Sequence, residues 1–362
     1  MAERNLQLVR RLSQAHDLAD DEWLELFSTW DDGDRAAAAQ LAAGVSRGHF
    51  GNRIFVRGIV EFSNHCRNDC LYCGLRASNR ACARYRLEPD QMLACCQAGY
   101  DYGFRTFVFQ SGEDPQFPVS RLAQTVRMVK GRFPDCAVTL SVGELSRDDY
   151  AALREAGADR YLLRHESASE EHYASLHPSS QQWGRRMQCL RWLKELGFQT
   201  GCGFMVGSPG QQPSHLVQEM RFLHDFRPAM IGIGPFIPHQ GTPLAKCPAG
   251  SAELTLFLLS LLRLQHPDVL LPATTALATL RPDGREAGVL AGANVIMPNL
   301  SPESAARRYV LYDNMKSDPA RSSVMESELQ RRMEAIGYTL SVGRGDYPPS
   351  AASGLAAGEE SR

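Results

Sequence analysis

The stretch IFVRGIVEFSNHCRNDCLYCGLR, residues 54–76, joins a β-strand pattern to a loop that carries three cysteines. Its first ten residues, 54–63, are mostly β-branched or apolar, which predicts a buried strand. Cys66, Cys70 and Cys73 follow directly, with the spacing C-x3-C-x2-C. In a barrel of parallel strands and helices, chemically active residues sit in loops of this kind, at the carboxyl ends of the strands.

Segments with a strand pattern alternate with segments with a helix pattern along the chain. Short apolar runs are followed by longer stretches whose apolar residues recur at helical spacing. This alternation predicts a parallel sheet with right-handed crossovers, and eight such units predict a closed (β/α)8 barrel of the TIM type, in the α/β class. An open doubly wound sheet is the alternative. The predicted strands are 54–63, 105–111, 137–143, 160–167, 199–207, 230–238, 269–277 and 293–299.

We expect four regions in the chain. Residues 1–50 have helical patterns and form a lead-in cap, and residues 51–300 form the barrel. Residues 301–348 return to helical patterns as a C-terminal extension. Residues 349–362 are small and polar, which is typical of a disordered tail.

The composition is that of an ordinary globular protein, with 43% hydrophobic and 22% charged residues and a formal net charge of -2. It indicates neither a nucleic-acid nor a membrane partner. The N-terminus has no apolar signal region, and no stretch is apolar for long enough to cross a bilayer. We therefore expect a cytoplasmic protein, whose ten cysteines are reduced thiols and metal ligands instead of disulfides.

The cysteine triplet offers one thiolate fewer than a structural zinc site requires, and no second C-x2-C or H-x3-H pair completes such a site. A [4Fe-4S] cluster held by three cysteines instead leaves one iron open to a small chelating molecule. The triplet therefore predicts one such cluster, with zinc as the alternative. The remaining cysteines are expected to pack as small hydrophobic side chains, and only Cys202 lies on a strand that could line the barrel.

The triplet, with Tyr72 before its third cysteine, resembles the signature of radical S-adenosylmethionine (SAM) enzymes. A wider resemblance, from about residue 50 to about residue 340, is to the HydE family, the radical SAM maturases of [FeFe]-hydrogenase. Biotin synthase and methylornithine synthase share the barrel and the triplet but resemble the chain less closely. The stretches that carry the wider resemblance are RYRLEPDQ, FQSGEDP, ADRYLLRHE, MVGSPGQ, GIGPFIPHQGTPLA, PATTA and GANVIMPN.

The resemblance implies that the open iron binds SAM and that an electron from the cluster cleaves SAM to methionine and a 5'-deoxyadenosyl radical. The carboxylate of Glu166 would accept hydrogen bonds from the ribose hydroxyls or the ammonium of SAM, and Arg186 would offer a planar fork to its carboxylate. An ordinary surface ion pair is the alternative for these two residues, and strand-end capping is the alternative for the serines and threonines. The implied SAM-site residues are Tyr72, Gln110, Ser111, Thr139, Ser141, Glu166, Arg186, Met205 and Tyr309, with Tyr312 near the mouth.

A second implied group binds an anionic substrate deeper in the barrel: Arg57, Arg160, Thr274 and Thr275. Two arginines directed into a barrel are costly unless they face an anion. The alternative is that either arginine points outward to a helix carboxylate. Some HydE proteins hold an accessory cluster with cysteines after the last strand, but no cysteine follows Cys247 here, so we expect none. The second cluster of biotin synthase is not expected either, because residues 105–111 contain no cysteine.

The family resemblance implies an anaerobic reaction in hydrogenase maturation on a cysteine-bound iron carbonyl cyanide species. The implied partners are the maturases HydG and HydF and an electron donor such as ferredoxin or flavodoxin. One alternative is a radical SAM mutase that acts on a small amino acid, as methylornithine synthase does. The other is a non-catalytic iron-sulfur protein.

Overall fold

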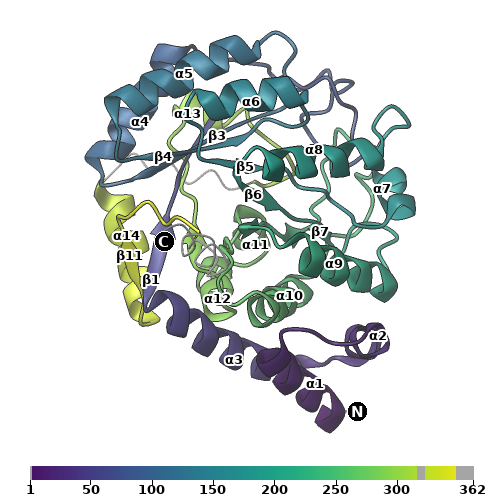
Figure 1. Cartoon of the computed structure of the whole chain (residues 1–362). Coiled ribbons are helices and arrows are strands. Elements are labelled where there is room, and N and C mark those ends of the chain that lie inside the picture. The colour runs from purple at the N-terminus through teal and green to yellow at the C-terminus, as the bar shows by residue number, and fades with distance from the viewer. Residues whose placement is uncertain (1, 316–322, 348–362) are drawn as a thin grey trace, which may run out of the picture.

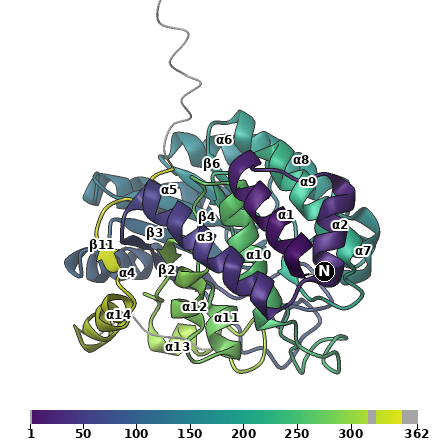
Figure 2. The same cartoon turned by 90° about the horizontal axis from the view of Figure 1, so that it is seen from below.

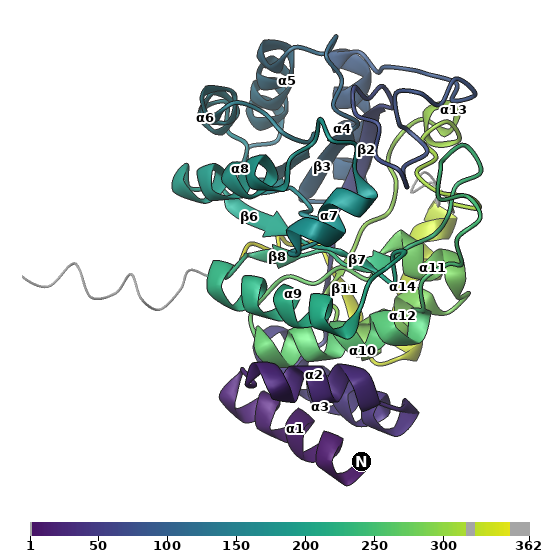
Figure 3. The ribbon, with the colours of Figure 1, turned by 90° about the vertical axis from the view of Figure 1, so that its right-hand side faces the viewer.

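Three helices open the chain in the computed structural model, which describes residues 2–315 and 323–347. The Asp31 side chain caps the third helix by accepting a hydrogen bond from the Asp34 amide at 3.0 Å. Trp30 stacks on Phe257 with ring centroids 5.0 Å apart, which fixes these helices to α10. Figure 3 shows them as a layer outside α10. Their bounds are α1 (Ala2–Ala15), α2 (Asp20–Thr29) and α3 (Asp32–Phe50), and α10 is Ala252–Gln265.

Parallel strands form the barrel wall (Figure 1). Six strands pair in the order β2-β3-β4-β5-β6-β8, and parallel bridges at Leu270, Pro272 and Asn299 complete the ring back to β2. The predicted (β/α)8 barrel is therefore confirmed. Its strands are β1 (Arg53–Val56), β2 (Gly58–Ser63), β3 (Thr106–Ser111), β4 (Ala137–Ser141), β5 (Arg160–Leu162), β6 (Gln199–Cys202), β7 (Met205–Val206), β8 (Met230–Ile231), β9 (Gly234–Pro235) and β10 (Val295–Ile296), with β11 (Thr339–Ser341) added beside β1.

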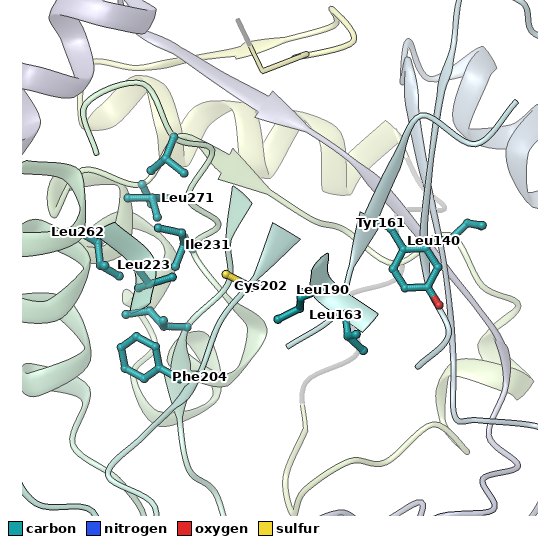
Figure 4. Packing of buried hydrophobic residues seen from close by; sticks show 14 of the residues in the cluster. Leu140, Tyr161, Leu163, Leu190, Cys202, Phe204, Leu223, Ile231, Leu262 and Leu271 are labelled. Atoms are coloured by element: carbon teal, nitrogen blue, oxygen red, sulfur yellow. The ribbon is translucent and has the colours of Figure 1, made fainter. Parts of the chain in front are cut away.

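Helices cover the outside of the wall, as the view from below shows (Figure 2). Cys202 packs in the layer between strands and helices, among Leu190, Leu223 and Ile231, so it does not line the barrel (Figure 4). No helix of the described residues is long and apolar enough to span a bilayer. The helices are α4 (Pro89–Asp101), α5 (Val119–Arg132), α6 (Arg147–Glu155), α7 (Glu170–Leu176), α8 (Trp183–Glu195), α9 (Pro213–Phe226), α11 (Thr275–Leu280), α12 (Gly284–Leu290), α13 (Glu303–Ala306) and α14 (Ser323–Ala335).

The predicted strand 269–277 was wrong in its second half. Pro272 has no amide hydrogen to donate to a neighbouring strand, and Thr274 is the N-cap of α11. The predicted strand 199–207 is broken at Gly203, whose φ of 155° is a conformation that other residues rarely adopt. The four predicted regions of the chain stay predictions, and the tail at 349–362 lies outside the described residues.

Residues 339–347, here called the C-terminal strap, cross the amino-terminal end of the barrel. The strap begins as β11, parallel to β1. Its Arg344 pairs with Asp159 at 3.0 Å, at the start of β5. Its Asp346 pairs with Arg160 at 2.6 Å, and the Tyr347 hydroxyl donates to Asp268 at 2.9 Å. The strap is therefore held to the barrel by charged and polar contacts.

We expect Asp346→Asn to destabilise the fold at neutral pH, because Arg160 is fully buried and loses its counter-charge. Burial alone would raise the pKa of the Asp346 carboxyl group, but the neighbouring Arg344 and Arg160 outweigh burial and lower this pKa. Its contribution is therefore present above the unfolded pKa of about 4 and is lost as the pH falls through the folded pKa. Because 37% of the Asp346 side chain is exposed, screening by water limits the expected loss in the free energy of unfolding to about 1–2 kcal/mol.

Urea unfolding at neutral and at acidic pH would measure this loss. The matched control is Asp283→Asn, which removes an exposed partner of Arg281. Its unfolding free energy should change by less than about 0.5 kcal/mol. An equal change in the two variants, or a difference that persists below the folded pKa of Asp346, would contradict the expectation.

Candidate active site

The three predicted cluster cysteines lie on the loop between β2 and α4, at the carboxyl end of the barrel. The loop is fixed by backbone hydrogen bonds, in which the amides of Arg67, Leu71 and Gly74 donate at 2.8–2.9 Å to carbonyls of two other loops and of the last residue of α7. Gly112 must be glycine here, because a Cβ atom would lie 2.4 Å from the His65 carbonyl oxygen. The cysteines therefore stand on a backbone that is held in place at several points.

The three thiols lie close enough to affect one another. Burial raises the pKa of Cys70 to about 12, and the Cys66 thiol adds to the rise. Burial, then Cys70 and Cys66, likewise raise the pKa of Cys73. Such thiols ionise only when a cation binds them, so three soft sulfurs on one loop fit a cysteine-held [4Fe-4S] cluster. Among the described residues, no three or more His, Cys, Asp and Glu side chains are grouped to hold a single metal ion.

Glu166 follows β5 at the same end of the barrel. It has a φ of 65°, which is rare for a residue with a side chain and which persists only where the surroundings enforce it. Its amide donates to the Gly203 carbonyl at 3.0 Å, and its carbonyl accepts from the Met205 amide at 3.3 Å. Its buried carboxylate faces Arg164 at 3.0 Å. The strained backbone thus fixes the direction of this carboxylate.

A buried pair beside Glu166 supports this conformation. His165 and Glu219 are both fully buried, with Nε2 and Oε2 2.7 Å apart. The Gly203 amide donates to His165 Nδ1 at 3.2 Å, so Nε2 carries the ring proton that Glu219 accepts. The other Glu219 oxygen accepts from the Ala168 amide at 2.7 Å. Sequence reasoning missed this pair, because Glu219 lies on a helix far along the chain.

Arg186, on α8, is also buried. Its Nε donates to Glu144 at 2.6 Å and its Nη1 donates to the Arg164 carbonyl at 2.6 Å. Although burial acts to lower it, the neighbouring Tyr173 and Glu144 raise the pKa of Arg186 well above its usual value. Arg186 and Glu166 therefore do not form an exposed ion pair with each other, and Arg186 keeps donors that these contacts do not use.

Tyr72 and Met205 meet in one apolar cluster with Leu176 and Phe236. The Tyr72 hydroxyl lies 3.2 Å from Nε2 of His177, a partner that the sequence did not indicate. Burial, followed by the negative charge of Glu166, raises the pKa of Tyr72. Glu166 joins this cluster through Met205, whose amide donates to the Glu166 carbonyl. The structure thus brings Tyr72, Met205 and Glu166 to one place.

The polar residues of β3 and β4 have different surroundings. Gln110 donates to the hydroxyl of buried Tyr309 at 3.3 Å, which joins β3 to the segment after the last strand. Ser111 donates to the Gly112 carbonyl at 2.7 Å, which is the local capping contact. Thr139 Oγ1 is buried and has no hydrogen-bond partner among the described residues, and Ser141 is half-buried at the end of β4. Thr139 therefore keeps a free hydroxyl for a ligand.

The four residues predicted to bind the substrate lie in two different places. Arg57 and Arg160 are buried against the strap: Arg57 contacts the Met230 sulfur at 2.9 Å and Arg160 pairs with Asp346. Neither arginine forms a described ion pair with a helix carboxylate. Thr274, at the start of α11, has a buried hydroxyl without a described partner. Thr275 begins that helix, and Tyr312 contacts its Thr279. Substrate binding by the four residues stays a prediction.

Comparison with known proteins identifies the family. Residues 60–223 match the radical SAM superfamily. Over 290 residues the chain is 45% identical to the [FeFe] hydrogenase maturase subunit HydE of Thermotoga maritima, a match that covers 80% of this chain and 82% of the maturase. The chain belongs to the HydE family. The radical SAM match and the identity with HydE together assign radical SAM chemistry to the chain.

Two further comparisons set this HydE-family chain beside methylornithine synthases. The 3-methylornithine synthase of Methanosarcina acetivorans is 27% identical over 90% of this chain and 91% of its own. A crystal structure of methylornithine synthase (PylB) superposes with a TM-score of 0.81 at 26% identity, covering 92% of this chain and 97% of that one. Biotin synthases are related as well. The HydE relative is the more similar in sequence, while the methylornithine synthase structure shows the shared fold.

Proposed function

We propose that this protein acts in assembly of the di-iron cofactor of [FeFe]-hydrogenase, on a cysteine-bound iron carbonyl cyanide precursor. The observation that carries the proposal is the 45% identity with a HydE maturase, which covers 80% of the chain. The precursor would come from HydG and the product would pass to HydF, with a ferredoxin or flavodoxin as electron donor. We place the protein in the cytoplasm and expect one cluster only, because no cysteine follows Cys247.

The residues at the barrel mouth have distinct roles in this proposal. Cys66, Cys70 and Cys73 would hold the cluster and leave one iron for SAM. When bound, the cluster supplies the electron that cleaves SAM reductively to a 5'-deoxyadenosyl radical. Glu166 would accept hydrogen bonds from SAM, and the free donors of Arg186 would bind its carboxylate. The fixed backbone of these residues would orient SAM toward the interior of the barrel.

The remaining implied residues surround the same place. Tyr72 and Met205 would pack against SAM, and the Gln110 and Tyr309 pair would close the site from the segment after the last strand. Tyr309 is only 2% exposed, so this segment would keep water from the reacting atoms. Thr139 and Thr274 would offer their unpartnered hydroxyls to polar groups of the bound molecules.

The proposal is tested by measuring 5'-deoxyadenosine formation by anaerobically reconstituted protein with SAM and a strong reductant. The reaction is run with and without the cysteine-bound iron dicarbonyl cyanide complex. We expect the complex to increase 5'-deoxyadenosine formation strongly and to be consumed in proportion. Cleavage without stimulation would reject the proposed substrate, and no cleavage by cluster-replete protein would reject a catalytic role.

The second candidate is a radical SAM mutase of a small amino acid. The observation that favours it is the superposition on methylornithine synthase, with a TM-score of 0.81. In the same assay, L-lysine would then stimulate 5'-deoxyadenosine formation and the iron complex would not.

A further inference from the structure

Glu61 is a buried carboxyl group that the proposed roles do not use. It lies on β2 with 3% of its surface exposed. Its register partner is Gln110 on β3, whose side chain contacts Tyr309. Phe62, the next residue, instead packs on Phe117 in the layer outside the wall. Because side chains alternate along a strand, Glu61 faces the interior of the barrel, below the cluster loop.

The carboxyl group has one hydrogen bond among the described residues. Asn299 Nδ2 donates to Oε2 at 2.8 Å. The Asn299 amide cannot turn to present its oxygen, because that oxygen accepts from the Ser301 amide at 2.8 Å. No lysine, arginine or histidine in the described part of the chain forms an ion pair with Glu61, in contrast to Glu144, which pairs with Arg186, and Glu219, which pairs with His165. A buried carboxyl group without a cation is costly, and a cationic ligand would remove that cost.

The unpartnered hydroxyls indicate where the rest of such a ligand lies. Thr139, on β4, pairs in register with Val108, which pairs with Ile59 on the strand of Glu61. Thr139 and Thr274 both have buried hydroxyls without described partners. A hydroxyl donates to a carboxylate as readily as it accepts, while a carboxylate accepts only. The barrel interior thus offers hydrogen-bond donors for a carboxylate and one acidic group for an ammonium, which are the two charged groups of an α-amino acid.

We propose that Glu61, oriented by Asn299, binds the α-ammonium group of an amino-acid-bearing substrate inside the barrel. This inference rests on the proposed function and narrows its substrate class to molecules with a free α-amino group. Burial raises the pKa of Glu61 to about 8, with Asn299 opposing the rise. Glu61 is therefore mostly protonated at neutral pH in the free protein. Binding an ammonium would ionise it and release a proton, so association strengthens as the pH rises toward 8.

The other groups that face Glu61 do not titrate in this range. The Glu61 backbone amide donates to the Ser301 hydroxyl oxygen at 2.7 Å, and Ser301 has no charge. Burial raises the pKa of the surrounding tyrosines further above neutrality, to about 12 for Tyr312. A pH dependence below 8 that arises in this part of the barrel therefore belongs to Glu61. The facing groups are Asn299 and Ser301 after β10, Gln110 on β3, Tyr85 on the cluster loop, and Tyr309 and Tyr312.

The test compares two probes that differ only in the amino group, S-methyl-L-cysteine and 3-(methylthio)propanoate, by calorimetry on cluster-replete protein with SAM. We expect the amino acid to bind at least tenfold more tightly, with affinity rising up to about tenfold from about pH 6 to about pH 7. Glu61→Gln keeps the size of the side chain and an acceptor for Asn299. It should abolish both the preference and the pH dependence.

Glu253→Gln, which makes the same substitution at an exposed position of α10, is the matched control and should behave like the wild type. Equal binding of the two probes, absence of binding by both, or a preference that survives in Glu61→Gln would overturn the inference. The comparison of the two probes on wild-type protein tests the preference for an amino group even if a variant does not fold. Failure of the proposed function would appear separately, as unstimulated 5'-deoxyadenosine formation with the iron complex while the amine preference holds.

Discussion

Cys70→Ala is expected to abolish the cluster and SAM cleavage together. A cubane held by three cysteines loses a third of its protein ligands in this variant, and the described residues near Cys70 offer no replacement thiol beyond Cys66 and Cys73. Gln181, whose oxygen lies 3.2 Å from the Cys70 sulfur, is a poor ligand for iron-sulfur clusters. We expect 5'-deoxyadenosine formation to fall by at least 100-fold and the visible absorption of the reconstituted cluster to disappear.

Cys202→Ala is the matched control for this experiment. Its thiol is fully buried between strands and helices, away from the cysteine loop. The variant should lose on the order of 1 kcal/mol of stability and retain its iron, sulfide and SAM cleavage. Retained SAM cleavage in Cys70→Ala, measured alongside iron and sulfide content, would refute the assignment of the cluster ligands.

The sequence predicted the barrel well because its strands have regular apolar patterns and its helices separate them. The prediction was wrong where a strand ends and a helix begins within one apolar segment. Residues 269–277 are apolar throughout the first part, but Pro272 and the N-cap at Thr274 end the strand and begin α11. The apolar patterns of the individual segments also do not predict that residues 339–347 return to the amino-terminal end of the barrel. Their position there depends on ion pairs between residues far apart in the sequence, such as Arg160 and Asp346.

The candidate site was predicted residue by residue from motifs, but its supporting contacts were not. The cysteine loop and Glu166 belong to continuous motifs, which a sequence shows directly. The partners Glu144 and Glu219 are ordinary helix or loop carboxylates in the sequence, and only tertiary packing buries them against Arg186 and His165. Glu61 lies inside the motif that carries the cysteines, yet its isolation from cations is visible only in three dimensions.

Arg186→Ala is expected to reduce both SAM affinity and stability. Arg186 donates charge-assisted hydrogen bonds of 2.6 Å to Glu144 and to the Arg164 carbonyl, and its remaining donors are proposed to bind the SAM carboxylate. Loss of that contact should weaken SAM binding by about 10- to 100-fold. Glu144 would be left mostly buried without its cation, at a cost of about 3 kcal/mol in the free energy of unfolding.

Glu144→Gln separates the two roles of Arg186. It removes the ion-pair partner but keeps an acceptor for Nε, so Arg186 retains its position and its proposed contact with SAM. We expect Glu144→Gln to lose stability and to retain SAM affinity within about threefold.

Arg186→Lys keeps the charge but not the planar fork. It should weaken SAM binding nearly as much as Arg186→Ala, because one ammonium group cannot replace the several donors of the guanidinium. SAM binding is measured by equilibrium dialysis of cluster-replete protein, and urea unfolding gives the stability. If Glu144→Gln weakens SAM binding as much as Arg186→Ala, then Arg186 acts only by holding Glu144 and does not contact SAM.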